Sequence, residues 1–151
     1  MKKYIFVILW LLLLAGCDVT KKVPEGSYLL NKVNIHSDVR GIGASDLKPY
    51  LRQKPNSSIP VIGKWKLHMY NIPDNDSTWL NRQMLKYGEP PVLLNEQLTA
   101  ISSEQIRLHL NNKGYLSAGV DTTVVKEDKK ANVSYDVTGN EPHRIRTFND
   151  T

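Results

Sequence analysis

The chain has 151 residues, a formal net charge of +5 and one cysteine. This length suits one domain of ordinary size, and a lone cysteine cannot form an internal disulfide, so an apolar core must stabilise the fold. No Lys- and Arg-rich block is dense enough to indicate a nucleic-acid-binding surface.

The N-terminus has the layout of an export signal. Lys2 and Lys3 form a basic head, and an apolar run follows from residue 4 to 14. This run is shorter than the roughly 20 apolar residues that a bilayer-spanning helix needs. If the signal is removed, the loss of the two lysines lowers the net charge from +5 to +3.

Cys17 follows directly on the three residues Leu14, Ala15 and Gly16. This arrangement resembles a bacterial lipobox, which implies cleavage after residues 1–16 and attachment of a diacylglyceryl group, with acyl chains such as palmitate, to the Cys17 thiol. Acyl chains anchor a protein because each buried CH₂ contributes about 0.8 kcal/mol. An ordinary secretory signal and an N-terminal membrane helix are the alternatives.

The elements predicted in the first half of the mature chain are short. Residues 17–27 are polar and are expected to form a tether, and 28–35 alternate as a strand. A short helix is expected over 47–53, capped by Ser45 or Asp46. The stretch 65–72 is spaced as a helix but also alternates as a strand, and a helix is expected over 78–86.

The strongest predicted helix runs from about residue 95 to 113 and ends at Gly114, where a left-handed residue is favoured. We expect its buried stripe to consist of Leu94, Leu98, Ile101 and Leu108, widened by Ile106 and Leu110. Ser102 and Gln105 also match a capping box, which would allow the helix to kink or restart there.

Two strands, 118–126 and 131–138, are expected to form a hairpin across the charged turn between them. The second alternates cleanly, with Ala131, Val133, Tyr135 and Val137 on one face. A further strand is expected over 143–148. The chain ends within it, so we expect the sequence to be a fragment of a longer protein.

No catalytic or metal-binding motif is present in the sequence. The four histidines are scattered, and the acidic stretch 74–76 lacks the glycine and glutamate of a calcium loop. We therefore expect no enzyme activity, no metal and no cofactor. Trp65, Tyr70 and Trp79 are interpreted as core residues, with a binding surface as the alternative.

Four stretches together resemble a known family. Residues 114–120 follow a long helix and open a hairpin, as in POTRA domains, the periplasmic repeats of BamA/TamA-like outer-membrane assembly proteins. Residues 23–33, 47–56 and 88–94 sharpen the likeness to the translocation and assembly module lipoprotein of Bacteroidota.

This resemblance implies an α+β fold of order β-α-α-β-β, with helices packed on one face of a small mixed sheet and an extra helical insertion. The expected domain covers 28–139, and 140–151 would begin a second repeat. In POTRA domains the last strand is central and the first hairpin strand is an edge.

The expected function is that of a lipid-anchored module at the outer membrane, facing the periplasm. It would bind outer-membrane protein clients, or a periplasmic partner such as a TamB-like protein, by β-augmentation. The expected binding edge consists of Val120, Asp121, Thr122, Thr123 and Val124. Asp121 is expected to discourage indiscriminate pairing, and Thr123 to face outward with its backbone. The alternative is a stand-alone lipoprotein that binds a ligand or a cell-wall component.

Overall fold

The computed structural model describes residues 18–139, 141 and 142. The signal residues 1–16, Cys17 and the strand expected over 143–148 lie outside this part of the chain. The described residues form two compact units. The sheet unit comprises Val23–Asn56 and the chain from Pro91 onward, and the helical unit comprises the chain up to Lys22 together with Ser57–Pro90.

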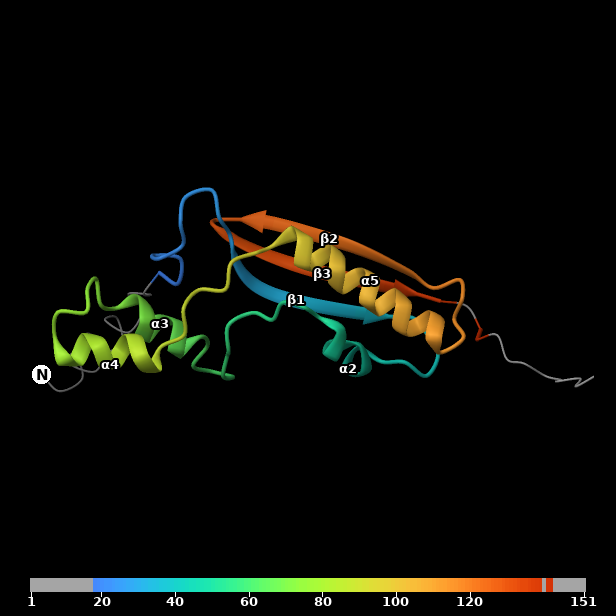
Figure 1. The fold of residues 1–151 in the computed structure, drawn as a ribbon, viewed down its shortest axis with the longest axis horizontal. Coiled ribbons are helices and arrows are strands. Elements are labelled where there is room, and N and C mark those ends of the chain that lie inside the picture. Colours follow the sequence, from blue (N-terminus) through green and yellow to red (C-terminus); the bar gives the residue numbers. More distant parts are fainter. Residues whose placement is uncertain (1–17, 140, 143–151) are drawn as a thin grey trace, which may run out of the picture. The chain divides into compact units, whose positions relative to one another are not determined.

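The sheet unit contains a three-stranded mixed sheet (Figure 1). Strands β1 (Leu29–Ser37), β2 (Gly119–Glu127) and β3 (Lys130–Thr138) are arranged in the order β1-β3-β2. β1 pairs with β3 in parallel and β2 pairs with β3 in antiparallel orientation. The predicted α+β class, the central last strand and the first hairpin strand at an edge are therefore confirmed.

A two-residue turn joins β2 to β3. Asp128 and Lys129 have φ angles of 45° and 58°. Positive φ at both central residues is the type I′ geometry, whose twist matches that of the flanking strands. The turn fixes the register in which Glu127 pairs with Lys130, and every later pair of the hairpin follows from it.

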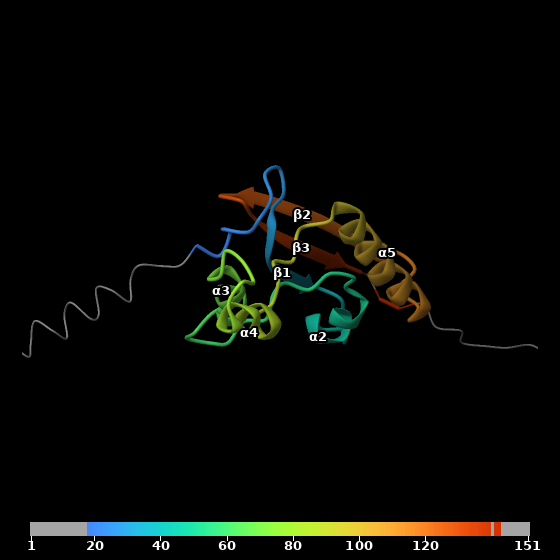
Figure 2. The ribbon, with the colours of Figure 1, turned by 60° about the vertical axis from the view of Figure 1, so that its left-hand side comes forward.

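Helix α5 (Glu96–Asn112) runs along one face of the sheet in both views (Figures 1 and 2). The Asn95 side chain accepts a hydrogen bond from the Leu98 amide at 3.1 Å and caps the helix. Gly114 ends it with φ 94°. Tyr115 is then buried, and its hydroxyl donates to the Arg40 carbonyl at 2.7 Å. The Gly-Tyr pair thus stops the helix and fixes the chain that leads into β2.

The core of the sheet unit lies between α5, the short helix α2 (Ala44–Leu47) and the inner face of the sheet. All four β3 residues predicted to face inward are buried. Three of them, Val133, Tyr135 and Val137, pack in one cluster with Ile106 and Leu110 of α5 and with Leu47 of α2. The side chains of Ile106, Leu110 and Leu47 are completely buried, so this contact accounts for much of the hydrophobic stabilisation.

The predicted stripe on α5 is partly wrong. Ile101 and Leu108 are 45% and 42% exposed, whereas Thr99 and Ser102 are buried. The Ser102 hydroxyl donates to the Leu98 carbonyl at 2.7 Å and accepts from the Arg52 amide at 2.9 Å. The Thr99 hydroxyl likewise donates to the Asn95 carbonyl at 3.1 Å. Because backbone groups satisfy both hydroxyls, Thr99 and Ser102 can be buried. The helix therefore faces the sheet with a side that includes these two residues rather than Ile101 and Leu108. The helix is continuous, so the alternative of a restart at Ser102 is also wrong.

The helix predicted over 47–53 is shifted. α2 begins at Ala44, and the 3₁₀ helix η1 (Lys48–Tyr50) follows it directly. Gly43 is the N-cap, and its amide donates to the Asp46 carboxylate at 2.9 Å. The capping role expected of Ser45 or Asp46 therefore belongs to the residue before them, with Asp46 bonding back to it.

The helical unit contains α3 (Trp65–Asn71) and α4 (Trp79–Tyr87), which pack together. Both helices begin within one residue of the predicted positions. Gly88 lies at their contact, because a Cβ built there would approach the Tyr70 Cα to 2.8 Å. Residues 18–22, predicted as part of a tether, pack in this unit, where Thr20 is buried.

Candidate interaction surface

The predicted edge residues lie along β2, at the outer edge of the sheet. Val120 and Val124 turn toward the covered face and are partly buried against the core, while Asp121, Thr122 and Thr123 are exposed. The structure thus brings all five residues together on one strand. Partner binding by them stays a prediction, because neither the structure nor the comparisons test it.

The register shows which backbone groups of β2 point away from the sheet. The turn makes Glu127 and Lys130 a hydrogen-bonded pair, and such pairs alternate with non-hydrogen-bonded ones along an antiparallel ladder. Thr123, paired with Ser134, is therefore of the hydrogen-bonded kind, and its expected outward orientation is wrong. The N–H and C=O groups of Val120, Thr122, Val124 and Lys126 point outward.

One contact supports this assignment independently. The Ser103 hydroxyl on α5 donates to the Val120 carbonyl at 3.4 Å. This contact agrees with a Val120 carbonyl that points away from β3. Thr122 and Val124 are then the two central positions at which an added strand could exchange backbone hydrogen bonds with β2.

The other edge of the sheet is partly occupied. The Leu30 amide of β1 donates to the Val92 carbonyl at 2.7 Å, and the Leu94 amide donates to the Tyr28 carbonyl at 2.8 Å. Residues 92–94 thereby form a short antiparallel bridge at the beginning of β1. The two edges differ, since no comparable bridge covers β2 within the part of the chain that the structure describes.

Asp121 lies on the sheet face opposite α5, directly across from Asp136 of β3. Like charges at opposed positions destabilise a sheet by roughly 0.2–1 kcal/mol. His36 of β1 is the neighbour of Asp136 on its other side. Asp121 was expected to discourage indiscriminate pairing at this edge. No role was predicted for Asp136, because its position opposite Asp121 depends on the register.

An ion pair holds the turn end of β2 beside α5. The Lys126 ammonium lies 2.6 Å from the Glu96 carboxylate and 5.1 Å from the centre of the Tyr28 ring. The hydrogen bond from Lys126 lowers the pKa of Glu96, and the same hydrogen bond raises the pKa of Lys126. This end of β2 is therefore charged at neutral pH and is occupied by contacts within the unit.

Two titratable residues of the described chain are engaged by neighbours of another kind. His109 stacks on Tyr50 with ring centres 4.2 Å apart, and burial lowers its pKa. Asp74 pairs with Lys21 at 2.6 Å rather than with other acids. No group of three or more candidate ligands that could hold a metal ion occurs among residues 18–139, 141 and 142.

The prediction that Trp65, Tyr70 and Trp79 fill a core is wrong for Trp79. Its side chain is 68% exposed, at the first residue of α4. Trp65 and Tyr70 are half-buried. The charges of α4 are the sequence feature that indicates an exposed helix with a basic side: it contains no acidic residue, and Arg82 and Lys86 are exposed.

Comparisons with known proteins agree with the resemblance at the family level. Residues 1–17 match the prokaryotic membrane lipoprotein lipid attachment site. Residues 28–139 match the POTRA family, described as a surface antigen variable number repeat. Neither the curated proteins nor the solved structures gave a match. None of the helices in the described residues has the length and apolar character needed to cross a bilayer.

The family match spans about three quarters of the chain and includes every strand of the sheet unit. The lipid attachment match ends at Cys17, one residue before the described chain begins. Together, the two matches and the observed fold establish that this chain is a membrane-anchored lipoprotein that belongs to the POTRA family.

Proposed function

We propose that this chain is the periplasmic module of a BamA/TamA-like assembly or translocation factor of the outer membrane, similar to the assembly module lipoprotein of Bacteroidota. It acts without enzymatic chemistry and binds extended segments of client proteins, or of a TamB-like partner, by β-augmentation along β2. The observation that carries this proposal is the edge position of β2 in a POTRA domain, with outward backbone groups at Thr122 and Val124.

The outward groups of β2 suit a binding mode that reads backbone rather than side chains. A net stabilisation of about 0.5–1.5 kcal/mol per added hydrogen bond is small, so a short segment binds reversibly. Backbone pairing depends little on the client's sequence, which fits a module that serves many clients. Because the ends of β2 are engaged by Ser103 and Glu96, the middle of the strand is the part left for a partner.

The opposed carboxylates of Asp121 and Asp136 complement this arrangement. A charge on an edge strand discourages pairing with unintended strands. Two carboxylates at one level of the sheet favour clients that carry Lys or Arg next to the paired segment. The cost of holding like charges together supports a role in partner choice rather than in folding.

The experiment compares Thr122→Pro with Thr122→Ala in cells. Proline deletes the outward N–H of Thr122 and leaves the ladder with β3 intact, whereas alanine keeps the N–H. A photo-cross-linking amino acid at the exposed Val125 position reports the neighbour of β2 in both variants. We expect the Ala variant to capture the same partner as the parent protein and the Pro variant to lose it.

One further variant is the control for folding. Thr123→Pro removes an N–H that points toward β3, so it should unfold the hairpin and lower circular dichroism in the strand region, unlike Thr122→Pro. Equal cross-linking by the folded Thr122→Pro and Thr122→Ala proteins would rule out β-augmentation at this edge. A reading frame that continues past Thr151 into further repeats would favour the assembly factor over a stand-alone lipoprotein.

A further inference from the structure

The helical unit exposes an unusual amount of apolar surface for its size. Its large apolar side chains that are mainly exposed are Ile59, Val61, Ile62, Ile72, Trp79, Leu80 and Tyr87. By contrast, Leu67 is its only buried large apolar side chain among the residues that the structure describes. So many exposed apolar side chains on a small unit indicate a surface that contacts a partner or a membrane.

Part of this surface is the outer side of α4. At 3.6 residues per turn, Trp79, Leu80 and Tyr87 fall within an arc of about 100°, which also contains the half-buried Gln83. All three are more than half exposed, and the exposed Arg82 and Lys86 border the arc. The Lys86 ammonium lies 5.8 Å from the centre of the Tyr87 ring, so its aliphatic stem runs beside the apolar arc. This is the composition of a helix that lies in the interfacial region of a bilayer.

The second part is the turn Ile59–Gly63. The Ile59 and Gly63 backbones exchange two hydrogen bonds of 2.9 and 2.8 Å, which close the turn. Val61 at its tip has φ 76° and is fully exposed, at 107% relative to a reference chain. A β-branched residue rarely adopts positive φ, because this conformation is strained. A fully exposed valine side chain gains no hydrophobic stabilisation that would offset the strain. The turn therefore presents an apolar tip at a cost in backbone strain.

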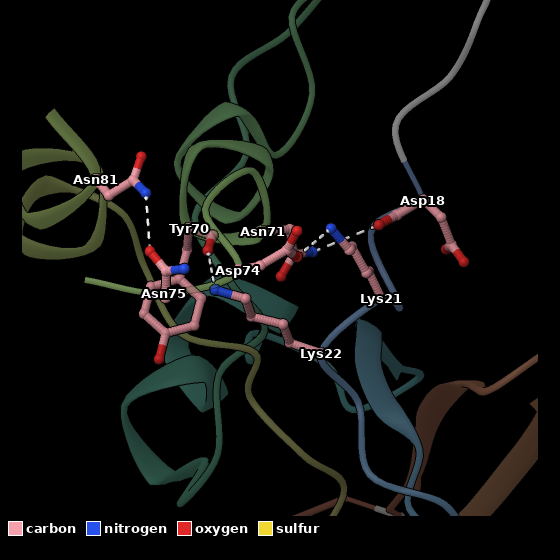
Figure 3. A network of polar contacts seen from close by, with 8 residues as sticks. All are labelled: Asp18, Lys21, Lys22, Tyr70, Asn71, Asp74, Asn75 and Asn81. Carbon is pink, nitrogen blue, oxygen red and sulfur yellow. Dashed lines mark hydrogen bonds and ion pairs between the residues drawn. The ribbon is translucent and has the colours of Figure 1, made fainter. Parts of the chain in front are cut away.

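The chain itself brings this unit close to a membrane. The lipid attachment match ends at Cys17, and Asp18 is the next residue. The Asn71 side chain of α3 donates to the Val19 and Asp18 carbonyls at 3.0 and 3.5 Å, as Figure 3 shows for Asp18. Lys22 donates to the Tyr70 carbonyl at 2.7 Å. Since one residue spans at most about 3.8 Å, the helical unit begins within a few ångströms of the acylated residue.

We propose that the helical unit is a membrane-contact module, in which the Ile59–Gly63 turn and the Trp79–Leu80–Tyr87 side of α4 enter the interfacial region of the bilayer that holds the Cys17 acyl chains. The inference rests on the lipid attachment site and on this unit alone. It is independent of partner binding by β2.

Charge distinguishes a lipid surface from an apolar protein partner. The described residues of the unit carry six Lys or Arg and four Asp or Glu, a net charge of 6 − 4 = +2. Neither α4 nor the stretch 57–72 contains an acid. Asp74 is neutralised by its ion pair with Lys21. Aromatic residues flanked by basic ones are favoured at the headgroup level, particularly with anionic lipids.

Two tryptophans of the mature chain permit a direct test. Trp65→Phe leaves Trp79 as the only tryptophan, because Trp10 leaves with the signal. The lipidated full-length protein is reconstituted in phosphatidylglycerol-containing vesicles with brominated acyl chains. We expect a blue shift and a loss of most Trp79 emission to bromine quenching. The reciprocal variant Trp79→Phe reports the half-buried Trp65, which should be quenched much less.

The apolar turn is tested in the Trp65→Phe background. Val61→Gly removes the apolar tip and suits the positive φ, so the fold is retained. It should restore part of the Trp79 emission. Val125→Thr alters a half-exposed valine on β2 and should leave the quenching unchanged.

Two results would overturn the proposal. One is Trp79 emission that resists brominated lipid while aqueous acrylamide still quenches it in vesicles. The other is Trp79 protected from acrylamide without lipid, together with a concentration-dependent rise in mass, because a second copy of the chain would then cover the face.

Discussion

The two units of this chain handle apolar residues in opposite ways. In the sheet unit, eleven residues from the strands, α2, α5 and the loops between them form one buried core, led by Leu47, Ile106 and Leu110. In the helical unit, half of the large apolar side chains are exposed, one is buried, and polar contacts join its segments. Asn71, Lys21 and Lys22 join residues 18–22 to α3 and its following loop (Figure 3).

The two units therefore depend on different stabilising interactions. Hydrophobic burial contributes roughly 25 cal/mol per Å² and gives the sheet unit a stability of its own. A unit with one buried large apolar residue has little of this term, so its polar contacts and its surroundings must supply the rest. The sheet unit should therefore be stable in water, and the helical unit should depend more on its anchor.

The largest effect is expected from the core of the sheet unit. Leu110→Ala removes a fully buried side chain of α5 and should cost about 2–5 kcal/mol of unfolding free energy. Leu108→Ala on the same helix removes a side chain that is largely exposed and should cost much less. Chemical denaturation of both variants measures the difference, and equal losses would mean that the buried side of α5 is assigned wrongly.

The next effect concerns the contact between the two helices of the helical unit. Gly88→Ala places a Cβ 2.6 Å from the Met84 carbonyl oxygen and 2.8 Å from Tyr70, which requires the helices to move. Such overpacking costs about 1–3 kcal/mol. Hydrogen exchange should quicken in α3 and α4 and stay unchanged in β3, since the two units have separate stabilities.

Gly43→Ala is the matched control for Gly88→Ala. A Cβ there meets no atom closer than 3.7 Å, so the substitution should alter exchange little. If Gly88→Ala instead quickened exchange in β3 as much as in α3, the two units would unfold as one.

A third effect tests the polar attachment of residues 18–22. Asn71 is buried, and Asn71→Ala leaves the Val19 carbonyl without its 3.0 Å hydrogen bond, at a cost of about 1–3 kcal/mol. Amide exchange at 18–22 should quicken. Asn81→Ala loses only an exposed contact with Asn75 at 3.3 Å and serves as the control. No difference between the two would show that Asn71 does not hold this segment.

The sequence predicted the sheet unit well because its patterns report burial directly. The alternation of β3 identified all four core residues, and Gly114 marked the end of α5 because its φ is one that other residues avoid. The buried side of α5 was predicted only in part: Ile106 and Leu110 were expected there, but Thr99 and Ser102 were not, since they count as polar in any apolar pattern. Only their hydrogen bonds to the backbone, which the sequence does not reveal, allow them to face the core.

The candidate site was predicted in its residues but not in its orientation. β2 was recognised as an edge through the family resemblance, whereas the outward direction of Thr122 rather than Thr123 depends on a one-residue choice of register. In the helical unit, core filling was the wrong expectation for Trp79. An aromatic residue does not have to enter a protein core: in the membrane contact that we propose, the exposed Trp79 ring is buried by lipid instead.

The smallest effect concerns the surface ion pair of the sheet unit. The hydrogen bond from Lys126 lowers the pKa of Glu96 below its ordinary value of 4.5, so the stability that this carboxylate contributes is present above pH 4.5. It is lost as pH falls through the lowered pKa of the folded protein.

The partner Lys126 has a pKa raised above 10.5, so its contribution is present below pH 10.5 and is lost as the pH rises through the raised pKa of the folded protein. Between these limits the pair contributes a constant amount, which is small because both side chains are exposed to screening water. Glu96→Gln should therefore lower stability slightly at pH 7 in low salt, and the difference from the parent protein should shrink as the pH falls below 4.5. Thermal unfolding of both proteins over a range of pH from 7 downward, with and without added salt, measures this. A difference that changes with neither pH nor salt would mean that Glu96 stabilises the N-terminus of α5 by packing rather than by charge.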